Sequence, residues 1–230
     1  MSRMFPFITH TVNPLGGGPC PYECTYCWAT NLKDRYSYKK YQGDWRIIPQ
    51  ELKKHDSKAF VFPFDMTEIG APSIPAEIID ELLEWIGKQS CQMLLLTKNP
   101  RFYYDWRNYI PENAIIGCTI ESDTNIMSDF SQAPAGYHRL WWMQEIGTHL
   151  PNKRFISIEP IMKFTPDFER EIMKINPWAV AVGYDNYNNG LPEPNLAATE
   201  NLIKELEFFT TVYRKTMREP SVASKGEKMS

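Results

Sequence analysis

The sequence predicts an α/β protein built as a partial (β/α)6 TIM-type barrel. Short apolar runs alternate with amphipathic stretches along the chain, and six such pairs occur within 230 residues. Parallel strands joined by right-handed helical crossovers curl into a barrel, and six units leave that barrel open. A flat, doubly wound sheet is the alternative that the alternating pattern leaves open.

The strand candidates are short and predominantly apolar, and they cover residues 7–13, 59–65, 92–97, 114–121, 154–159 and 178–183. Five helix candidates lie between them, at residues 28–38, 75–88, 102–106, 137–147 and 168–175. A last helix is expected over residues 197–217, where Leu202, Leu206 and Phe209 recur at helical spacing.

The composition fits one soluble globular domain. The hydrophobic fraction is 43%, and no run of about 18 apolar residues indicates a membrane span. A net charge of −3 gives no overall signature of nucleic-acid binding. We expect residues 1–218 to form the core domain and residues 219–230 to be a flexible polar tail.

Three cysteines, Cys20, Cys24 and Cys27, are spaced C-x3-C-x2-C near the start of the chain. Three thiolates leave a tetrahedral zinc site incomplete. They can, however, hold three irons of a four-iron cubane and leave the fourth iron open to a ligand. Glycines at 16–18 give a pliable loop before the motif, and prolines on both sides of Cys20 stiffen it. The motif therefore predicts a [4Fe-4S] cluster.

Two other uses of these thiols fit the sequence less well. A disulfide scaffold is disfavoured because the five cysteines are an odd number and no signal-peptide pattern precedes them. A zinc site needs a distant fourth ligand, since no second cysteine pair follows. The candidates for that ligand are His10, His55, His138 and His149. The two remaining thiols, Cys91 and Cys118, are expected to be structural.

Polar residues follow the predicted strands at their carboxyl ends, where barrel enzymes place their chemistry. Asp65, Thr67 and Glu68 follow the second strand, and turn capping is the alternative role for the first two. Lys98 follows the third strand. Its ammonium group could meet a carboxylate or phosphate of a ligand or substrate, or pair with a glutamate of the next strands.

The fourth and fifth strands alternate polar and apolar residues. Thr119 and Glu121 share one face, as do Ser157 and Glu159, and these faces should point into the barrel. Cys118 then faces the helices. A glutamate inside a barrel is costly unless it is paired or bound to a ligand, so both glutamates are site candidates. A buried ion pair with a neighbouring base is the alternative.

The cysteine spacing resembles the cluster motif of the radical S-adenosylmethionine (SAM) enzymes, whose core is a partial barrel. Segments 13–14, 96–98, 117–121 and 155–160 are similar to a poorly characterised radical SAM family of phages, bacteria and archaea. That family is distantly similar to spore photoproduct lyase. The similarity covers roughly residues 8–185. The sixth-strand ending at 183–186, Gly-Tyr-Asp-Asn, departs from the family's glycine-rich, Glu-Ser ending.

This resemblance implies cofactor contacts for particular residues. The open iron would chelate the amino and carboxylate groups of SAM, and Asp65, Thr67 or Glu68 would contact the amino group. Tyr26 would lie against the adenine, with packing beside Trp28 as the alternative. The other expected contacts come from strand ends, where Gly183 allows close backbone approach and Tyr184 could flank the adenine. They are Thr119, Glu121, Ser157, Glu159, Gly183 and Tyr184.

A basic, aromatic stretch follows the cysteines. Residues 31–46 hold five bases and two acids, a net charge of +3, among tyrosines and a tryptophan. If a nucleic acid is the substrate, Lys39 and Lys40 would contact phosphates, while Tyr36, Tyr38 or Tyr41 would stack on bases. A solvated helix face with packing aromatics is the alternative.

The expected function is an enzyme that reductively cleaves SAM to a 5'-deoxyadenosyl radical, which abstracts hydrogen from an unidentified substrate. That substrate is a nucleic acid to be modified or repaired, or a small molecule or peptide. A flavodoxin or ferredoxin is the expected electron donor. Reduced cysteines and an iron–sulfur cluster indicate the cytoplasm and sensitivity to oxygen. A non-catalytic iron–sulfur sensor that binds the cofactor or a nucleic acid is the alternative.

Overall fold

The computed structural model describes residues 4–36 and 39–221. Its strands are β1 (His10–Val12), β2 (Leu15–Gly16), β3 (Arg46–Ile47), β4 (Phe60–Pro63), β5 (Gln92–Thr97), β6 (Ala114–Thr119), β7 (Arg154–Ile158), β8 (Ala179–Val182) and β9 (Thr211–Arg214). Its α-helices are α1 (Trp28–Tyr36), α2 (Ala76–Gly87), α3 (Arg101–Asp105), α4 (Gly136–Ile146), α5 (Phe168–Ile175) and α6 (Leu196–Glu207). Short 3-10 turns occupy Lys39–Tyr41, Pro49–Glu51 and Asn125–Asp129.

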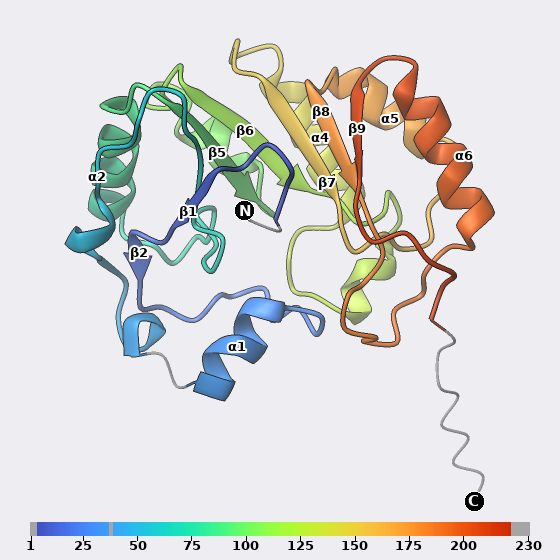
Figure 1. The fold of residues 1–230 in the computed structure, drawn as a ribbon, viewed down its shortest axis with the longest axis horizontal. Coiled ribbons are helices and arrows are strands. Elements are labelled where there is room, and N and C mark those ends of the chain that lie inside the picture. Colours follow the sequence, from blue (N-terminus) through green and yellow to red (C-terminus); the bar gives the residue numbers. More distant parts are fainter. Residues whose placement is uncertain (1–3, 37–38, 222–230) are drawn as a thin grey trace, which may run out of the picture.

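Seven of these strands form one parallel sheet in the order β1-β4-β5-β6-β7-β8-β9. Because spatial order follows chain order, every crossover advances in the same direction, and the sheet curls instead of being wound from both sides. Figure 1 shows this curved sheet, with α2 and α6 outside its two ends and α1 beyond the carboxyl ends of the strands. The predicted open barrel is confirmed, and the flat doubly wound sheet is not found.

The outer face of the sheet packs against the helices. On α2, Ile79, Leu82 and Ile86 are buried at spacings of three and four residues, which places them on one face. They belong to the same core cluster as Ile116 and Cys118 of β6. Cys118 therefore faces the helices, as the strand alternation predicts, and Cys91 is also buried in this outer core.

The inner face of the barrel is filled at its amino end by residues that precede β1, among them Phe5 and Phe7. The Phe5 ring packs edge-on against Phe155, with the ring centroids 4.8 Å apart. The Phe7 ring packs against the rings of Trp178 and Tyr213, with centroid separations of 5.3 and 5.1 Å. These aromatic contacts fill the space where the strands begin. The open space of the barrel therefore lies toward the carboxyl ends of the strands.

The last predicted helix is wrong over its second half. The helix α6 ends at Glu207, and residues 211–214 instead form β9, a seventh strand parallel to β8. Thr210, Thr211 and Val212 are β-branched and favour extended backbone, which stops the helix although apolar residues continue at helical spacing. Phe208 is 89% exposed at the turn between the two elements.

The final residues continue from β9 along the end of the barrel. Arg218 pairs with the buried Glu193 at 2.6 Å, and the backbone N–H of Ser221 donates to the same carboxylate. The first part of the predicted tail is therefore bound to the domain, and residues 222–230 lie outside the described residues. None of the helices in the described part of the chain has the length and apolar character of a membrane span.

Gly136 begins α4 against the backbone of the loop after β6. A Cβ atom at this position would lie 1.7 Å from the carbonyl oxygen of Ser122. We expect Gly136→Ala to lower the free energy of unfolding by roughly 1–3 kcal/mol, because the backbone must move to make room. Urea denaturation followed by circular dichroism measures this change.

Gly87, at the end of α2, provides the matched control. Its Cβ would meet only Pro111, at an ordinary contact distance of 3.6 Å. Gly87→Ala should therefore be neutral or slightly stabilising. Equal effects of the two substitutions would contradict the close packing of α4 on this loop.

Candidate active site

The three predicted cluster ligands lie on one loop between β2 and α1. Cys20, Cys24 and Cys27 are free, half-buried thiols, and all three line a single cavity. The backbone N–H of Cys27 donates to the Cys24 carbonyl, and α1 begins immediately afterwards at Trp28. Burial and the charges of Glu68 and the other two thiols raise the pKa of Cys20 to about 12. A bound cation would offset that cost of charge.

A later segment of the chain supports this loop from outside. The N–H groups of Gly17 and Gly18 donate to the carbonyls of Lys40 and Gly43, at 2.8 and 2.7 Å. Both glycines have positive φ, and a Cβ on Gly17 would lie 1.8 Å from the Asp44 carbonyl oxygen. Glycine is therefore required by both the backbone conformation and the close approach.

Arg46 organises that supporting segment. Its guanidinium group donates to four backbone carbonyls, those of Lys39, Lys40, Gln42 and Asp44, at 2.7 to 3.2 Å. The planar guanidinium group has several N–H donors in fixed directions, so it can bind several carbonyl groups at once better than a lysine ammonium group could. The basic, aromatic stretch thus has a structural task beside the cysteine loop.

This arrangement bears on the residues predicted to contact a nucleic acid. Lys40 pairs with Glu51 at 2.7 Å and is only a quarter exposed, whereas Lys39 is exposed. Tyr41 is half-buried under the Lys40 ammonium group. Tyr38 lies outside the described residues. Of the two lysines, Lys39 is the one placed in solvent.

The cavity has a volume of about 1000 Å³ and opens at the carboxyl ends of the strands. The cysteine loop forms one wall. The other walls bring together most of the predicted site residues from strands far apart in the sequence. These are Tyr26, Asp65, Thr67, Glu68, Lys98, Thr119, Ser157, Glu159 and Tyr184.

The three candidates after β4 differ in what already binds them. Glu68 accepts from the Thr97 hydroxyl and from the N–H groups of Lys98 and Gly70, so both its oxygens are engaged. Asp65 accepts from the Asn13 amide on one oxygen, and burial raises its pKa. The Thr67 hydroxyl is buried without a hydrogen-bond partner among the described residues. Thr67 and Asp65, which both line the cavity, therefore retain unused hydrogen-bonding capacity.

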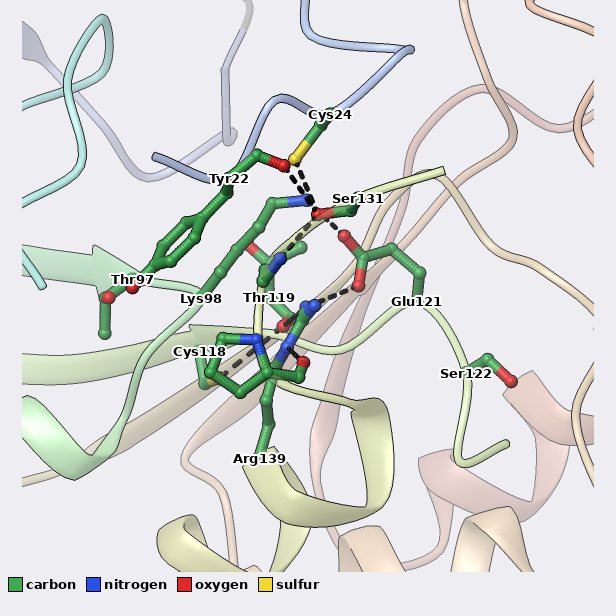
Figure 2. A network of polar contacts seen from close by, with 12 residues as sticks. Tyr22, Cys24, Thr97, Lys98, Cys118, Thr119, Glu121, Ser122, Ser131 and Arg139 are labelled. Carbon is green, nitrogen blue, oxygen red and sulfur yellow. Dashed lines mark hydrogen bonds and ion pairs between the residues drawn. The ribbon is translucent and has the colours of Figure 1, made fainter. Parts of the chain in front are cut away.

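Glu121 is the centre of a buried polar network below the cysteine loop (Figure 2). It is fully buried and accepts from the Arg139 guanidinium and the Tyr26 hydroxyl, both at 2.6 Å, and from the Lys98 ammonium. The same ammonium donates to the Tyr26 hydroxyl and lies 4.5 Å from the centroid of its ring. Glu121 thus connects the cysteine motif with β5, β6 and α4, and its carboxylate is held by protein groups.

Burial alone would raise the pKa of Glu121, but the charges of Arg139 and Lys98 lower it to about 2. Burial alone would lower the pKa of Lys98, but the Glu121 carboxylate raises it. The network is therefore ionised at neutral pH. Burial and the nearby Glu121 charge raise the pKa of Tyr26, so its phenol is neutral.

The remaining predicted residues lie on the opposite side of the cavity. Glu159 pairs with Lys215 at 2.9 Å. Gly183 is approached closely by the chain itself, because a Cβ there would lie 2.9 Å from Cβ of Lys215. Tyr184 is fully buried, and its hydroxyl is bound to the Pro194 carbonyl and to Thr199 of α6. Its hydroxyl end therefore points to the helix layer.

Two residues of the site are absent from the sequence predictions. Arg139 is fully buried and also donates to the Thr119 carbonyl at 2.8 Å. The sequence signal for Arg139 is its spacing on α4, because it lies four and seven residues before the buried Met143 and Ile146 and so shares their helix face. Ser131, whose hydroxyl lies 3.0 Å from the Cys24 sulfur, gives no comparable signal.

The donor set fits an iron–sulfur cubane with an open iron, because three free thiols face one cavity that also holds an unpartnered hydroxyl. Within the described ranges, no three histidine, cysteine, aspartate or glutamate side chains surround a single metal-ion position. A cubane differs from such a site because each thiolate binds a different iron.

The Glu121 network makes stability depend on pH. Because the folded pKa is about 2 and the ordinary value is 4.5, the unfolded chain binds this proton more readily. The contribution is present above pH 4.5 and is lost as the pH falls toward 2. We expect Glu121→Gln to cost roughly 3–5 kcal/mol of unfolding free energy at pH 7. Below pH 4.5 the difference from the wild type should narrow in urea titrations.

Glu84→Gln is the matched control, since Glu84 pairs with Lys88 on the surface of α2. Exposed pairs of this kind contribute about 1 kcal/mol or less. A Glu121 variant as stable as this control would show that the network contributes nothing to the fold.

Comparison with known proteins finds similarity in fold but no significant similarity in sequence. No protein-family model matches this sequence, and no curated protein matches it significantly. Solved structures do match. A spore photoproduct lyase variant superimposes with a TM-score of 0.61 at 10% identity, over 91% of this chain and 77% of that one. Another variant, with bound AdoMet and dinucleoside spore photoproduct, gives 0.58 at 10% identity, over 94% and 80%.

Streptococcus suis SuiB also matches, with a TM-score of 0.52 at 10% identity, over 90% of this chain. This chain spans about half of SuiB, covering 49% of its length. The TM-scores demonstrate a common fold, and at identities this low the chemistry must be argued from the site itself. The expected resemblance to spore photoproduct lyase is confirmed for the fold, a partial barrel of parallel strands with helices outside.

Proposed function

We propose that this protein is a radical SAM enzyme. The observation that carries the proposal is the position of the cysteine loop: three free thiols line a cavity of about 1000 Å³ at the carboxyl ends of a parallel half-barrel. Barrel enzymes place their reacting groups at this end. The presence of AdoMet in a structure with the same fold supports the same cofactor here.

In this proposal Cys20, Cys24 and Cys27 hold a [4Fe-4S] cluster, and SAM occupies the neighbouring cavity. The bound cofactors supply one chemical capability, the one-electron cleavage of SAM to a 5'-deoxyadenosyl radical. The protein's own residues position the cofactor and exclude water from the reacting atoms. Phe62, Leu96 and Met66 give the cavity apolar surface for that exclusion.

Thr67 and Asp65 are the residues we assign to the amino group of SAM, because both residues line the cavity and their oxygens retain unused acceptor capacity. Thr119 and Ser157 line the barrel interior between the cysteine loop and the far wall and can donate to ribose or carboxylate oxygens. Tyr26 has its hydroxyl bound to Glu121 and Lys98, so its ring is held in place beside the cysteines. We retain it as the ring next to the adenine.

The substrate side of the cavity is formed by residues 184–187 and 214–216 with Glu159. Its cations are already paired: Lys215 binds Glu159, and Arg214 binds Glu200 and Glu207. Such a wall favours an uncharged reacting group over a phosphate. Structures with this fold hold a dinucleoside spore photoproduct or a precursor peptide, SuiA. A nucleobase and a peptide side chain both meet the requirement.

The electron donor in this proposal is a flavodoxin or ferredoxin, and the compartment is the cytoplasm. The runner-up is an iron–sulfur sensor that binds SAM without turnover. The cavity extends beyond the predicted SAM contacts to residues 184–187 and 214–216. This observation favours an enzyme, because an enzyme needs room for a substrate and a sensor does not. Reduced, cluster-loaded protein should form 5'-deoxyadenosine from SAM even without substrate. Tight SAM binding with no 5'-deoxyadenosine would favour the sensor.

Anaerobic reconstitution should give about four irons and four sulfides per chain. Replacing Cys20, Cys24 or Cys27 with Ala should remove most of this iron and abolish SAM cleavage. Cys91→Ala and Cys118→Ala are the controls, because both thiols are buried in the outer core. Iron and sulfide assays with electron paramagnetic resonance measure the result. Stoichiometric zinc without iron in anaerobically purified protein would refute the cluster.

Thr67→Val should weaken SAM binding to the loaded, unreduced protein by about tenfold or more, since it removes a hydrogen bond to a charged group. Equilibrium dialysis with labelled SAM measures this affinity. Thr25→Val, at an exposed position of the cysteine loop, is the control. Equal affinities of wild type and Thr67→Val would remove Thr67 from the SAM site.

A further inference from the structure

The Glu121 network holds more positive than negative charge. Two cations, Lys98 and Arg139, share the single Glu121 carboxylate, and Tyr26 adds a neutral hydroxyl. Glu121 and Arg139 are completely buried, and the Lys98 side chain is only 17% exposed. One guanidinium nitrogen of Arg139, Nη2, is buried without a hydrogen-bond partner among the described residues. Charges so placed are weakly screened by water and salt.

This excess of positive charge lies on the Cys24 side of the cysteine loop. Figure 2 shows the Lys98 ammonium group directed from β5 toward Cys24, Ser131 and Glu121. The Cys24 sulfur contacts the Ser131 hydroxyl and packs in the same small cluster as Tyr26. The Lys98 ammonium group lies 4.5 Å from the centroid of the Tyr26 ring, two residues after Cys24, and Arg139 joins the same network through Glu121.

Asp65 and Glu68 also line the cavity beside the loop, and the carboxylate of Glu68 helps to raise the pKa of Cys20. Three hydrogen bonds hold the Glu68 carboxylate, from Thr97, Lys98 and Gly70. The loop is thus flanked by a carboxylate on the Cys20 side and by two cations sharing one carboxylate on the Cys24 side. A negatively charged group bound to this loop is therefore stabilised by the cations on the Cys24 side.

We propose that Lys98, Glu121 and Arg139 set the reduction potential of the cluster held by the cysteine loop, by fixing positive charge next to Cys24. The inference rests on the proposed function. The relevant step adds one electron from an external low-potential donor, makes and breaks no bond, and leaves the loop one negative charge richer. Nearby positive charge stabilises that reduced state, and net charge is one of the factors that set cluster potentials.

The sign of the effect distinguishes this role from simple support of the loop. Lys98→Met removes positive charge at nearly constant length and should lower the potential. Glu121→Gln removes negative charge and should raise it. The double variant restores the original net charge and should return toward the wild-type potential, although two polar contacts are lost. Lys98→Arg keeps the charge and should stay near the wild type.

The experiment uses the full chain, reconstituted anaerobically, with iron and sulfide counted for every variant. Potentiometric titration followed by electron paramagnetic resonance and absorbance gives the midpoint of the one-electron reduction. Lys153→Met is the control, because Lys153 is exposed beside the amino end of β7, at the opposite end of the barrel. Its midpoint should not move. If Glu121→Gln does not fold, Lys98→Met against Lys98→Arg still gives the sign.

Opposite shifts for Lys98→Met and Glu121→Gln, with recovery in the double variant, would support the inference. Unchanged midpoints, or shifts in the same direction in both single variants, would overturn it while leaving the proposed function intact if all proteins carry about four irons. A wild-type protein that binds no iron would overturn both. A Lys98→Arg protein that behaves as Lys98→Met would show that geometry, and not charge, is responsible.

Discussion

The buried carboxylate of Glu121 is the interaction on which the arrangement of this site depends. It receives donors from three separate parts of the chain: Tyr26 from the cysteine motif, Lys98 after β5 and Arg139 from α4. Removing Lys98 or Arg139 would alter the charge balance of this buried network, and removing the Tyr26 hydroxyl would take one hydrogen bond from the carboxylate. The position of the cysteine loop relative to the barrel is therefore tied to the packing of a helix on its outer face.

The two ends of the barrel have different tasks. At the amino end, Phe5, Phe7, Phe155 and Trp178 fill the interior with contacts between aromatic rings. At the carboxyl end the strands finish in hydroxyl, carboxylate and ammonium groups around open space. The division follows from parallel topology, which brings all strand ends of one kind to the same edge.

Much of this fold is readable from local sequence patterns. The strand predicted at 92–97 agrees with β5, and the alternation on β6 correctly separates Cys118 from the interior. A period of two in strands and of 3.6 in helices indicates which face of the element is buried, and each of these elements buries one face in the core. Thr211 and Val212 were misassigned to a helix because apolar spacing continues past its end. Their pairing with β8 is a contact that no local window contains.

The site is harder to predict from the sequence, because its interactions join residues that are far apart in the chain. Polar strand ends at Asp65, Thr67, Thr119 and Ser157 were found, and they do line the cavity. The glutamates could be placed near the interior, and Lys98 could be named as a base able to pair with one of them, as it does with Glu121, but the other partners could not be named. Glu121 binds Arg139 of α4, and Glu159 binds Lys215, which follows β9 in a segment that the sequence predicts as helix. Without those partners, the sequence leaves open whether each glutamate contacts a ligand or forms a buried ion pair.

The short ladder between β2 and β3 has a consequence for how this chain can vary. Leu15 pairs with Ile47, and Gly16 pairs with Arg46, so the cysteine motif and α1 form an excursion whose two ends are fixed to each other. Once a loop is closed at its base, doubling its length costs only about 0.6 kcal/mol of closure entropy. Insertions beyond Cys27 can therefore accumulate without moving the thiols. Natural variation in length should concentrate there, where new surface can be added at the mouth of the barrel while the chemistry below it stays constant.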